Sequence, residues 1–140
     1  MKKLQFVGGC LCGNVRYAYS GPILDANYCH CTDCRRVTGS AFNVGVRIRA
    51  AEFIITQGEV REFTKQGDSG NSLTRHFCGN CGSPLYTSSP LHDDFLFIKA
   101  GSLDDSSAIV PTDQSWISSA VSWANISPDL PQHQKESGQS

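Results

Sequence analysis

The sequence carries no surplus of positive charge, because 12 lysines and arginines stand against 13 aspartates and glutamates and the formal net charge is −1. It therefore lacks the cationic field that draws a protein to nucleic acid or to anionic lipid. It also contains no apolar run of about 18 residues, the length that a transmembrane helix needs. We expect neither a nucleic acid nor a membrane as a partner.

A targeting signal is missing as well. The opening residues MKKLQFVGG contain two lysines but not the apolar segment of about 7 to 15 residues found in a secretory signal peptide. We therefore expect a cytoplasmic protein. This placement affects how the seven cysteines are interpreted, since clustered thiols in the reducing cytosol indicate metal or redox chemistry more often than disulfides.

Long helical patterns are scarce, and short alternating runs separated by glycine predict β-strands instead. Val15, Tyr17 and Tyr19 fall on one face of such a strand, and residues 42–49 alternate apolar and polar side chains. Further strands are expected at 53–56, 60–64, 72–77, 85–87 and 95–100. Short helical turns are expected after Thr32 and at 103–108. The predicted fold is mostly β, built of several small sheets.

The chain shows no internal repeat and no linker that would divide it. At 140 residues it is long enough to bury about two-thirds of its surface on folding. We predict one zinc-binding catalytic domain over residues 1–126. Residues 127–140, SPDLPQHQKESGQS, contain two prolines and no apolar period, which predicts a polar, flexible tail.

The seven cysteines have the spacing of metal ligands. They form three groups: Cys10 and Cys12 in C-L-C, Cys29, Cys31 and Cys34 in C-H-C-T-D-C, and Cys78 and Cys81 in C-G-N-C. Glycines 79 and 82 favour a tight turn that aims N–H groups at sulfur, as in a zinc knuckle. The middle three cysteines share one short loop and can close on one ion with little loss of chain entropy. The other four then form a structural site that joins distant strands.

A three-thiolate site would leave one position of a tetrahedral zinc ion open. Structural zinc sites have four protein ligands, whereas catalytic sites have three and keep the fourth for water or substrate. Three thiolates make such a centre net −1, which suits a soft incoming ligand such as a thiol and hence carbon–sulfur chemistry. We therefore predict two Zn²⁺ per chain, with Cys29, Cys31 and Cys34 as ligands of the catalytic one.

Other arrangements stay open from the residues alone. The C-T-D-C and C-G-N-C pairs could share one metal, as in a zinc ribbon, or the C-x-C-x-x-C run could hold an iron–sulfur cluster. His30, His76, His92 or a carboxylate could also close the three-cysteine site. A closed site would favour a non-catalytic zinc module that binds a protein partner, and an open one favours an enzyme.

Polar residues beside the cysteine loop are candidates for contact with substrate. They are Thr32, Asp33, Arg35, Arg36 and Ser40. Arginine offers a fork of donors that fits a carboxylate, so Arg35 and Arg36 could form an anion pocket with Arg47 and Arg49. The last two could equally be the solvated face of a strand.

Four ordered motifs resemble the glutathione-dependent formaldehyde-activating enzyme family, which includes centromere protein V. They are GGCLCG (8–13), CHCTDCRRVTGSAF (29–42), FCGNCGSPL (77–85) and AGSLDD (100–105). The resemblance spans roughly residues 8–131. It implies a fold similar to the zinc-binding chaperone Mss4, with small antiparallel sheets around a structural zinc. The implied ligands of that zinc match Cys10, Cys12, Cys78 and Cys81, and those of a second, labile zinc match Cys29, Cys31 and Cys34.

The resemblance also implies a carbon–sulfur lyase that, in reverse, joins formaldehyde to glutathione to give S-hydroxymethylglutathione. We expect this chain to act on a small thiol, such as glutathione, and an aldehyde. One position departs from the family. Many members have Pro-x-x-His-Ile-Trp near the C-terminus, where this chain has Pro111, Gln114, Ser115 and Trp116.

Overall fold

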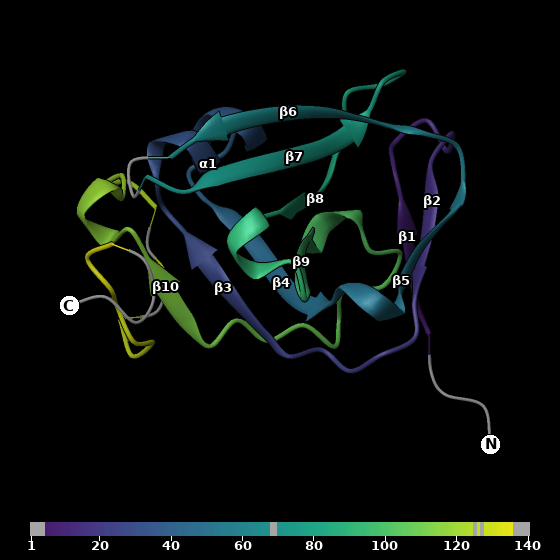
Figure 1. Ribbon diagram of the computed structural model, residues 1–140. Helices are drawn as coiled ribbons and strands as arrows, with labels where there is room; N and C mark the ends of the chain where they lie inside the picture. Colours follow the sequence, from purple (N-terminus) through teal and green to yellow (C-terminus); the bar gives the residue numbers. More distant parts are fainter. Residues whose placement is uncertain (1–4, 68–69, 125, 127, 136–140) are drawn as a thin grey trace.

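Two β-sheets form the computed structural model, which describes residues 5–67, 70–124, 126 and 128–135 (Figure 1). The smaller sheet has the order β1-β2-β5, with β1 at Phe6–Gly9, β2 at Arg16–Tyr19 and β5 at Phe53–Gln57. The larger sheet has the order β10-β3-β4-β9-β8-β7-β6. Its strands are β3 (Asp25–Cys29), β4 (Asn43–Arg49), β6 (Val60–Gln66), β7 (Ser72–Cys78), β8 (Pro84–Ser88), β9 (Phe95–Lys99) and β10 (Asp113–Ser115).

The prediction of a mostly β fold is confirmed, with three differences in detail. The strands gather into two sheets, and β10 pairs with β3 in parallel whereas the other strand pairs are antiparallel. Residues 103–108 were expected to form a helical turn but do not, since Leu103 instead forms a bridge to Gly8. In the described residues the regular helices are α1 (Thr32–Thr38) and short 3-10 turns at Ala50–Glu52, Pro90–His92, Ala100–Ser102 and Ile117–Ser119.

The hydrophobic core joins the smaller sheet to the larger one. Val15, Tyr17 and Tyr19 are 1%, 0% and 0% exposed, as their alternation predicts, and they share one cluster with Val46 and Ile98 of the larger sheet. Figure 1 shows the smaller sheet at one end of the molecule and β10 at the other. The smaller sheet therefore packs on the core at the end of the molecule opposite β10.

The cysteine loop between β3 and β4 ends in helix α1. Cys31 is the N-cap, and its sulfur accepts a hydrogen bond from the backbone N–H of Cys34 at 3.2 Å. At the other end Gly39 adopts φ 68°, a left-handed conformation that suits glycine and ends the helix. These two caps explain why a helix of seven residues persists beside the site.

Part of the segment expected to be a tail lies against β10. Gln114 N donates to the carbonyl of Pro131 at 2.8 Å, and Trp116 N donates to that of Lys135 at 2.8 Å. Residues 127 and 136–140 lie outside the described residues. The division into a domain over 1–126 and a separate tail stays a prediction. Throughout the described part of the chain, every helix is too short or too polar to cross a membrane.

Candidate metal centres and active site

The first cysteine cluster joins the β1–β2 loop to the β7–β8 loop. The sulfurs of Cys10, Cys12, Cys78 and Cys81 all lie within 4.8 Å of one another. Cys10 Sγ is 3.6 Å from Cys12 Sγ, which in turn is 3.8 Å from Cys78 Sγ. A tetrahedral zinc ion with bonds of about 2.3 Å would place its sulfurs about 3.8 Å apart. The donor set therefore fits zinc.

Hydrogen-bond donors surround these sulfurs as they do in a zinc knuckle. The backbone N–H groups of Asn80 and Cys81 point at Cys78 Sγ, at 3.3 and 3.4 Å. Val15 N lies 3.2 Å from Cys10 Sγ. A hydrogen bond from the Ser83 hydroxyl lowers the pKa of Cys81 to about 5, so that this thiol is ionised at neutral pH. Ionised sulfur is the form that binds metal.

The second cluster forms where β3 meets α1. The sulfurs of Cys29, Cys31 and Cys34 lie within 4.8 Å of one another. Hydrogen bonds from Cys31 and Cys34 lower the pKa of Cys29 to about 3, and the contact with Cys29 raises the pKa of Cys34. Without a cation, three crowded sulfurs share one negative charge. A divalent ion would let all three ionise, so this donor set also fits zinc.

The candidates for a fourth ligand lie elsewhere. His30 turns its Nε2 to Gln114, and His76 turns its Nε2 to the Ser88 hydroxyl at 2.9 Å. His92 lines the cavity described below. Of the histidines, cysteines and carboxylates in the described residues, only the three cysteines have ligand atoms within this cluster. The structure also keeps the C-T-D-C and C-G-N-C pairs apart, in different clusters.

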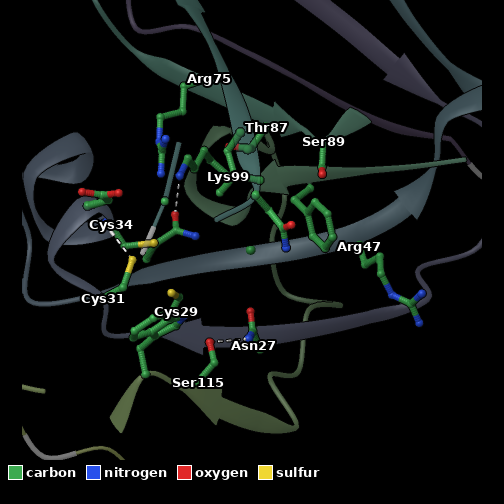
Figure 2. A pocket seen from close by; sticks show the side chains of 18 of the residues that line it. Asn27, Cys29, Cys31, Cys34, Arg47, Arg75, Thr87, Ser89, Lys99 and Ser115 are labelled. Carbon is green, nitrogen blue, oxygen red and sulfur yellow. Dashed lines mark hydrogen bonds between the residues drawn. The ribbon is translucent and has the colours of Figure 1, made fainter. Parts of the chain in front are cut away.

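A cavity of about 600 Å³ opens beside the three-cysteine cluster (Figure 2). This volume is within the range of about 300 to 1,000 Å³ that small-molecule sites occupy. Its lining includes all three cysteines of the second cluster. It also includes buried polar residues, among them Ser115 and Thr87 at 5% and 9% exposure. The cluster therefore faces a space where a small polar molecule fits.

One face of the larger sheet forms the floor of this cavity. Side chains that are in register on neighbouring strands lie on the same face. One such row consists of Arg75, Thr87, Phe97, Arg47 and Asp25, and a second of Lys99, Gly45, Asn27 and Asp113. All nine line the cavity. Val46 and Ile48 alternate with these residues along β4 and are buried in the core on the other face.

Cys29 belongs to a third row of the same floor, between Asn43 on β4 and Ser115 on β10. Asn27 donates from Nδ2 to Ser115 Oγ at 3.0 Å, which leaves the serine O–H to donate elsewhere. A hydrogen bond from Ser115 helps to lower the pKa of Cys29, after the larger effects of Cys31 and Cys34. The parallel strand β10 thus holds one metal-ligand candidate in place.

The predicted substrate residues fall into two groups. Thr32 and Asp33 line the cavity, and Asp33 Oδ1 pairs with Lys65 Nζ at 2.6 Å. Arg35 and Arg36 are not among the lining residues, and Ser40 lines a separate hollow. Of the four arginines expected around an anion pocket, only Arg47 lines the cavity, where it pairs with Asp25 at 2.7 Å.

Two buried cations of the cavity were not predicted from the sequence. Arg75 and Lys99 are each 8% exposed and lie on β7 and β9. Their strands were expected at 72–77 and 95–100, but neither residue was singled out as a candidate. The sequence alone does not tell whether the polar face of a strand meets solvent or a cavity, and therefore could not identify these two residues as part of the site.

Gln114, where the resemblance leads us to expect a histidine, points away from the cavity. It is 1% exposed, and its Oε1 lies 2.9 Å from Nε2 of His30. Its neighbours Asp113 and Ser115 line the cavity, as the alternation of a strand requires. The side chain at this position therefore supports the cysteine loop and does not face the space for substrate.

The fold and the two clusters define a small β protein with two candidate metal centres, one of them open to a cavity. The family model of the glutathione-dependent formaldehyde-activating enzyme matches residues 5–119, and the chain belongs to this family. A protein of Halomonas elongata, provisionally named a glutathione-dependent formaldehyde-activating enzyme, is 30% identical over 107 residues. The match covers 69% of this chain and 64% of that protein.

A solved structure shares the fold. The crystal structure of a Rhodobacter sphaeroides protein superimposes with a TM-score of 0.57 and 21% sequence identity. The superposition covers 75% of this chain and 91% of that one. At this identity the likeness supports the architecture alone.

Proposed function

We propose that the chain is a zinc-dependent carbon–sulfur lyase that makes or breaks the bond between a small thiol and a small aldehyde. The formation of S-hydroxymethylglutathione from glutathione and formaldehyde is the reaction that the family name suggests. The observation that carries the proposal is the three-cysteine cluster. In the described residues it has no fourth protein ligand, and it borders a cavity of about 600 Å³.

The two clusters would have different roles. Cys10, Cys12, Cys78 and Cys81 would hold a structural zinc, because they join loops that are distant in sequence. Cys29, Cys31 and Cys34 would hold the catalytic zinc. Zinc bound there would lower the pKa of a thiol that approaches it.

The reaction balances without an oxidant or a reductant. In the direction of synthesis the substrate S–H bond breaks, sulfur bonds to the aldehyde carbon, and the carbonyl oxygen takes up a proton. Asn27 and Ser115 would hold Cys29 during this step. Phe97 and Trp116 line the cavity and would exclude water from it. Thr32 and Asp33, which also line it, remain candidates for contact with substrate.

Cobalt substitution tests access to the second centre. The Co²⁺ form of the protein is titrated with glutathione while its thiolate charge-transfer absorption is recorded. We expect the absorption to change on binding, and we expect no such change in Cys31→Ser, which lacks one ligand. An unchanged spectrum with every small thiol would favour the non-catalytic module instead.

A kinetic experiment tests the chemistry. Exchange between formaldehyde and its glutathione adduct is followed by NMR with and without the zinc-loaded protein. We expect the protein to accelerate exchange and Cys31→Ser to give the uncatalysed rate. Equal rates with and without protein would contradict the proposed activity.

A further inference from the structure

Two cations in the cavity have no acidic partner within the described part of the chain. Lys99 donates from Nζ to the neutral Oδ1 of Asn43 at 2.8 Å. Among the described residues, the Arg75 side chain has neither a hydrogen-bond partner nor an ion-pair partner. Both side chains are more than nine-tenths buried. Burial of unpaired charge is strongly unfavourable, so two such cations in one cavity require a nearby negative charge to offset them.

The two cations serve the same part of the cavity. Figure 2 shows the Arg75 guanidinium and the Lys99 side chain directed toward the region of Cys34. Burial lowers the pKa of Lys99, the nearby Cys34 sulfur opposes this effect, and the charge of Arg75 adds to it. These mutual effects agree with close spacing of the three groups.

The other charged residues of the floor are already paired. Arg47 pairs with Asp25 at 2.7 Å, and Asp113 lies 3.4 Å from His133. Three thiolates would exceed the charge of one Zn²⁺ by a single negative charge, which one cation can balance. Arg75 and Lys99 together would leave one positive charge over, on the side of the cavity next to the cysteines.

We propose that Arg75 and Lys99 bind a carboxylate of the thiol substrate, so that the site selects anionic thiols over neutral ones. A guanidinium presents parallel donors to a carboxylate, and an ammonium adds a point charge. Ser89, which is 5% exposed, lines the same cavity and accepts a hydrogen bond from Leu91 N at 3.3 Å. Its O–H is therefore left to donate to the carboxylate. This inference rests on the proposed function, which places the substrate sulfur at the three-cysteine cluster.

Calorimetric titration of the zinc-loaded protein tests the carboxylate site with three probes. They are 3-mercaptopropionate, its neutral methyl ester, and propionate, which has no thiol. We expect the affinity for the acid to exceed that for its ester by about ten-fold or more, as a charge-assisted bidentate contact would give. Arg75→Gln and Lys99→Gln should reduce this preference toward one. Arg75→Lys keeps the charge but loses the guanidinium fork, so its preference for the acid should lie between those of the unmodified protein and Arg75→Gln.

Arg47→Gln is the matched control. It removes the same charge from the same cavity floor, but from a residue that already has Asp25 as a partner. A general electrostatic field would make Arg47→Gln as damaging as Arg75→Gln, whereas a specific contact makes Arg75→Gln much worse. Equal losses, or an acid and an ester that bind alike to the unmodified protein, would overturn the proposal.

The zinc content of Arg75→Gln and its affinity for propionate distinguish a carboxylate site from a role in balancing the charge of the metal centre, and from failure of the proposed function. If Arg75→Gln loses one zinc per chain yet keeps its preference for the acid, the cations balance the metal centre and the inference is wrong. If thiols fail to bind at the metal, the proposed function fails. Loss of propionate binding in Arg75→Gln would then still support the carboxylate site.

Discussion

Gln114 Oε1 lies 2.9 Å from Nε2 of His30, and this buried contact joins β10 to the loop that carries three cysteines. A backbone contact reinforces it, since His30 N donates to the carbonyl of Ser115 at 3.0 Å. His30 stands between Cys29 and Cys31 in the sequence. The short parallel strand therefore controls where these two sulfurs point, although Gln114 does not face the cavity.

Gln114→Ala should weaken metal binding at the three-cysteine cluster about 10- to 100-fold, the usual effect of removing a group that supports metal ligands. Gln114→His keeps a possible hydrogen-bond partner for His30 and should retain most of the affinity. Competition with a chromophoric chelator measures both. The four-cysteine cluster serves as the internal control and should not change. Equal affinities in Gln114→Ala and the unmodified protein would contradict the supporting role.

Loss of a ligand should have different effects at the two clusters. Cys78→Ser or Cys81→Ser should unfold the protein or greatly reduce the yield of folded material, because the first cluster joins the β1–β2 and β7–β8 loops. Cys31→Ser should fold and contain one zinc fewer. Circular dichroism and metal analysis of the purified proteins give the comparison. Equal loss of folding in all three variants would contradict the division into structural and catalytic centres.

Gly45→Val should block the cavity while the protein still folds. Gly45 lies in the middle of the floor, between Lys99 and Asn27, and the nearest atom to an added Cβ would be Asn43 Nδ2 at 3.4 Å. Valine is favoured in strands, so the free energy of unfolding should stay within about 1 kcal/mol. Thiol affinity should fall about ten-fold or more, because the side chain occupies space that the substrate needs.

Gly45→Ala is the control for this variant. Its single methyl group should reduce thiol affinity much less than valine does, with the same stability. Titration calorimetry and urea denaturation measure the two quantities. A valine variant that binds thiols normally would show that the substrate does not occupy this floor.

Trp116 should store backbone strain at the edge of the cavity. It adopts φ 56° and ψ 42°, a left-handed conformation, and its N–H is held by the carbonyl of Lys135. A residue with a Cβ loses about 1 to 2 kcal/mol there. Trp116→Gly should therefore be more stable than Trp116→Ala by about 1 kcal/mol in the free energy of unfolding, as measured by urea denaturation. Both variants lose the indole ring and should weaken thiol binding to the same extent. An alanine variant that is more stable than the glycine variant would contradict the strain.

Most of the strands that the sequence predicted have an apolar face in the core, although β6 was predicted as well and is mostly exposed. Val15, Tyr17 and Tyr19 revealed β2, and the alternation over 42–49 revealed β4. Three strands were missed, namely β1, β3 and β10. For β3 and β10 the reason is that they are short and several of their side chains face the polar cavity, which removes the apolar signal. Their parallel pairing joins residues far apart in sequence, and no local pattern encodes it.

The cysteine grouping could be inferred from spacing, since three ligands on one loop need little chain entropy to meet. The substrate residues were harder. Arg35 and Arg36 are adjacent to the loop in sequence, but α1 places them away from the cavity lining. Arg75 and Lys99 reach it from strands that are distant in sequence. Sequence proximity to a metal ligand was therefore a poor guide to the contents of the cavity.

Alternate residues of β4 face two different environments, and substitutions are tolerated differently in each. Asn43, Gly45 and Arg47 face the cavity, while Val46 and Ile48 face the core. Natural drift or directed evolution can exchange residues of the first set without disturbing the packing of the second. Members of such a lineage can thus diverge in the molecules that they accept and still keep one architecture.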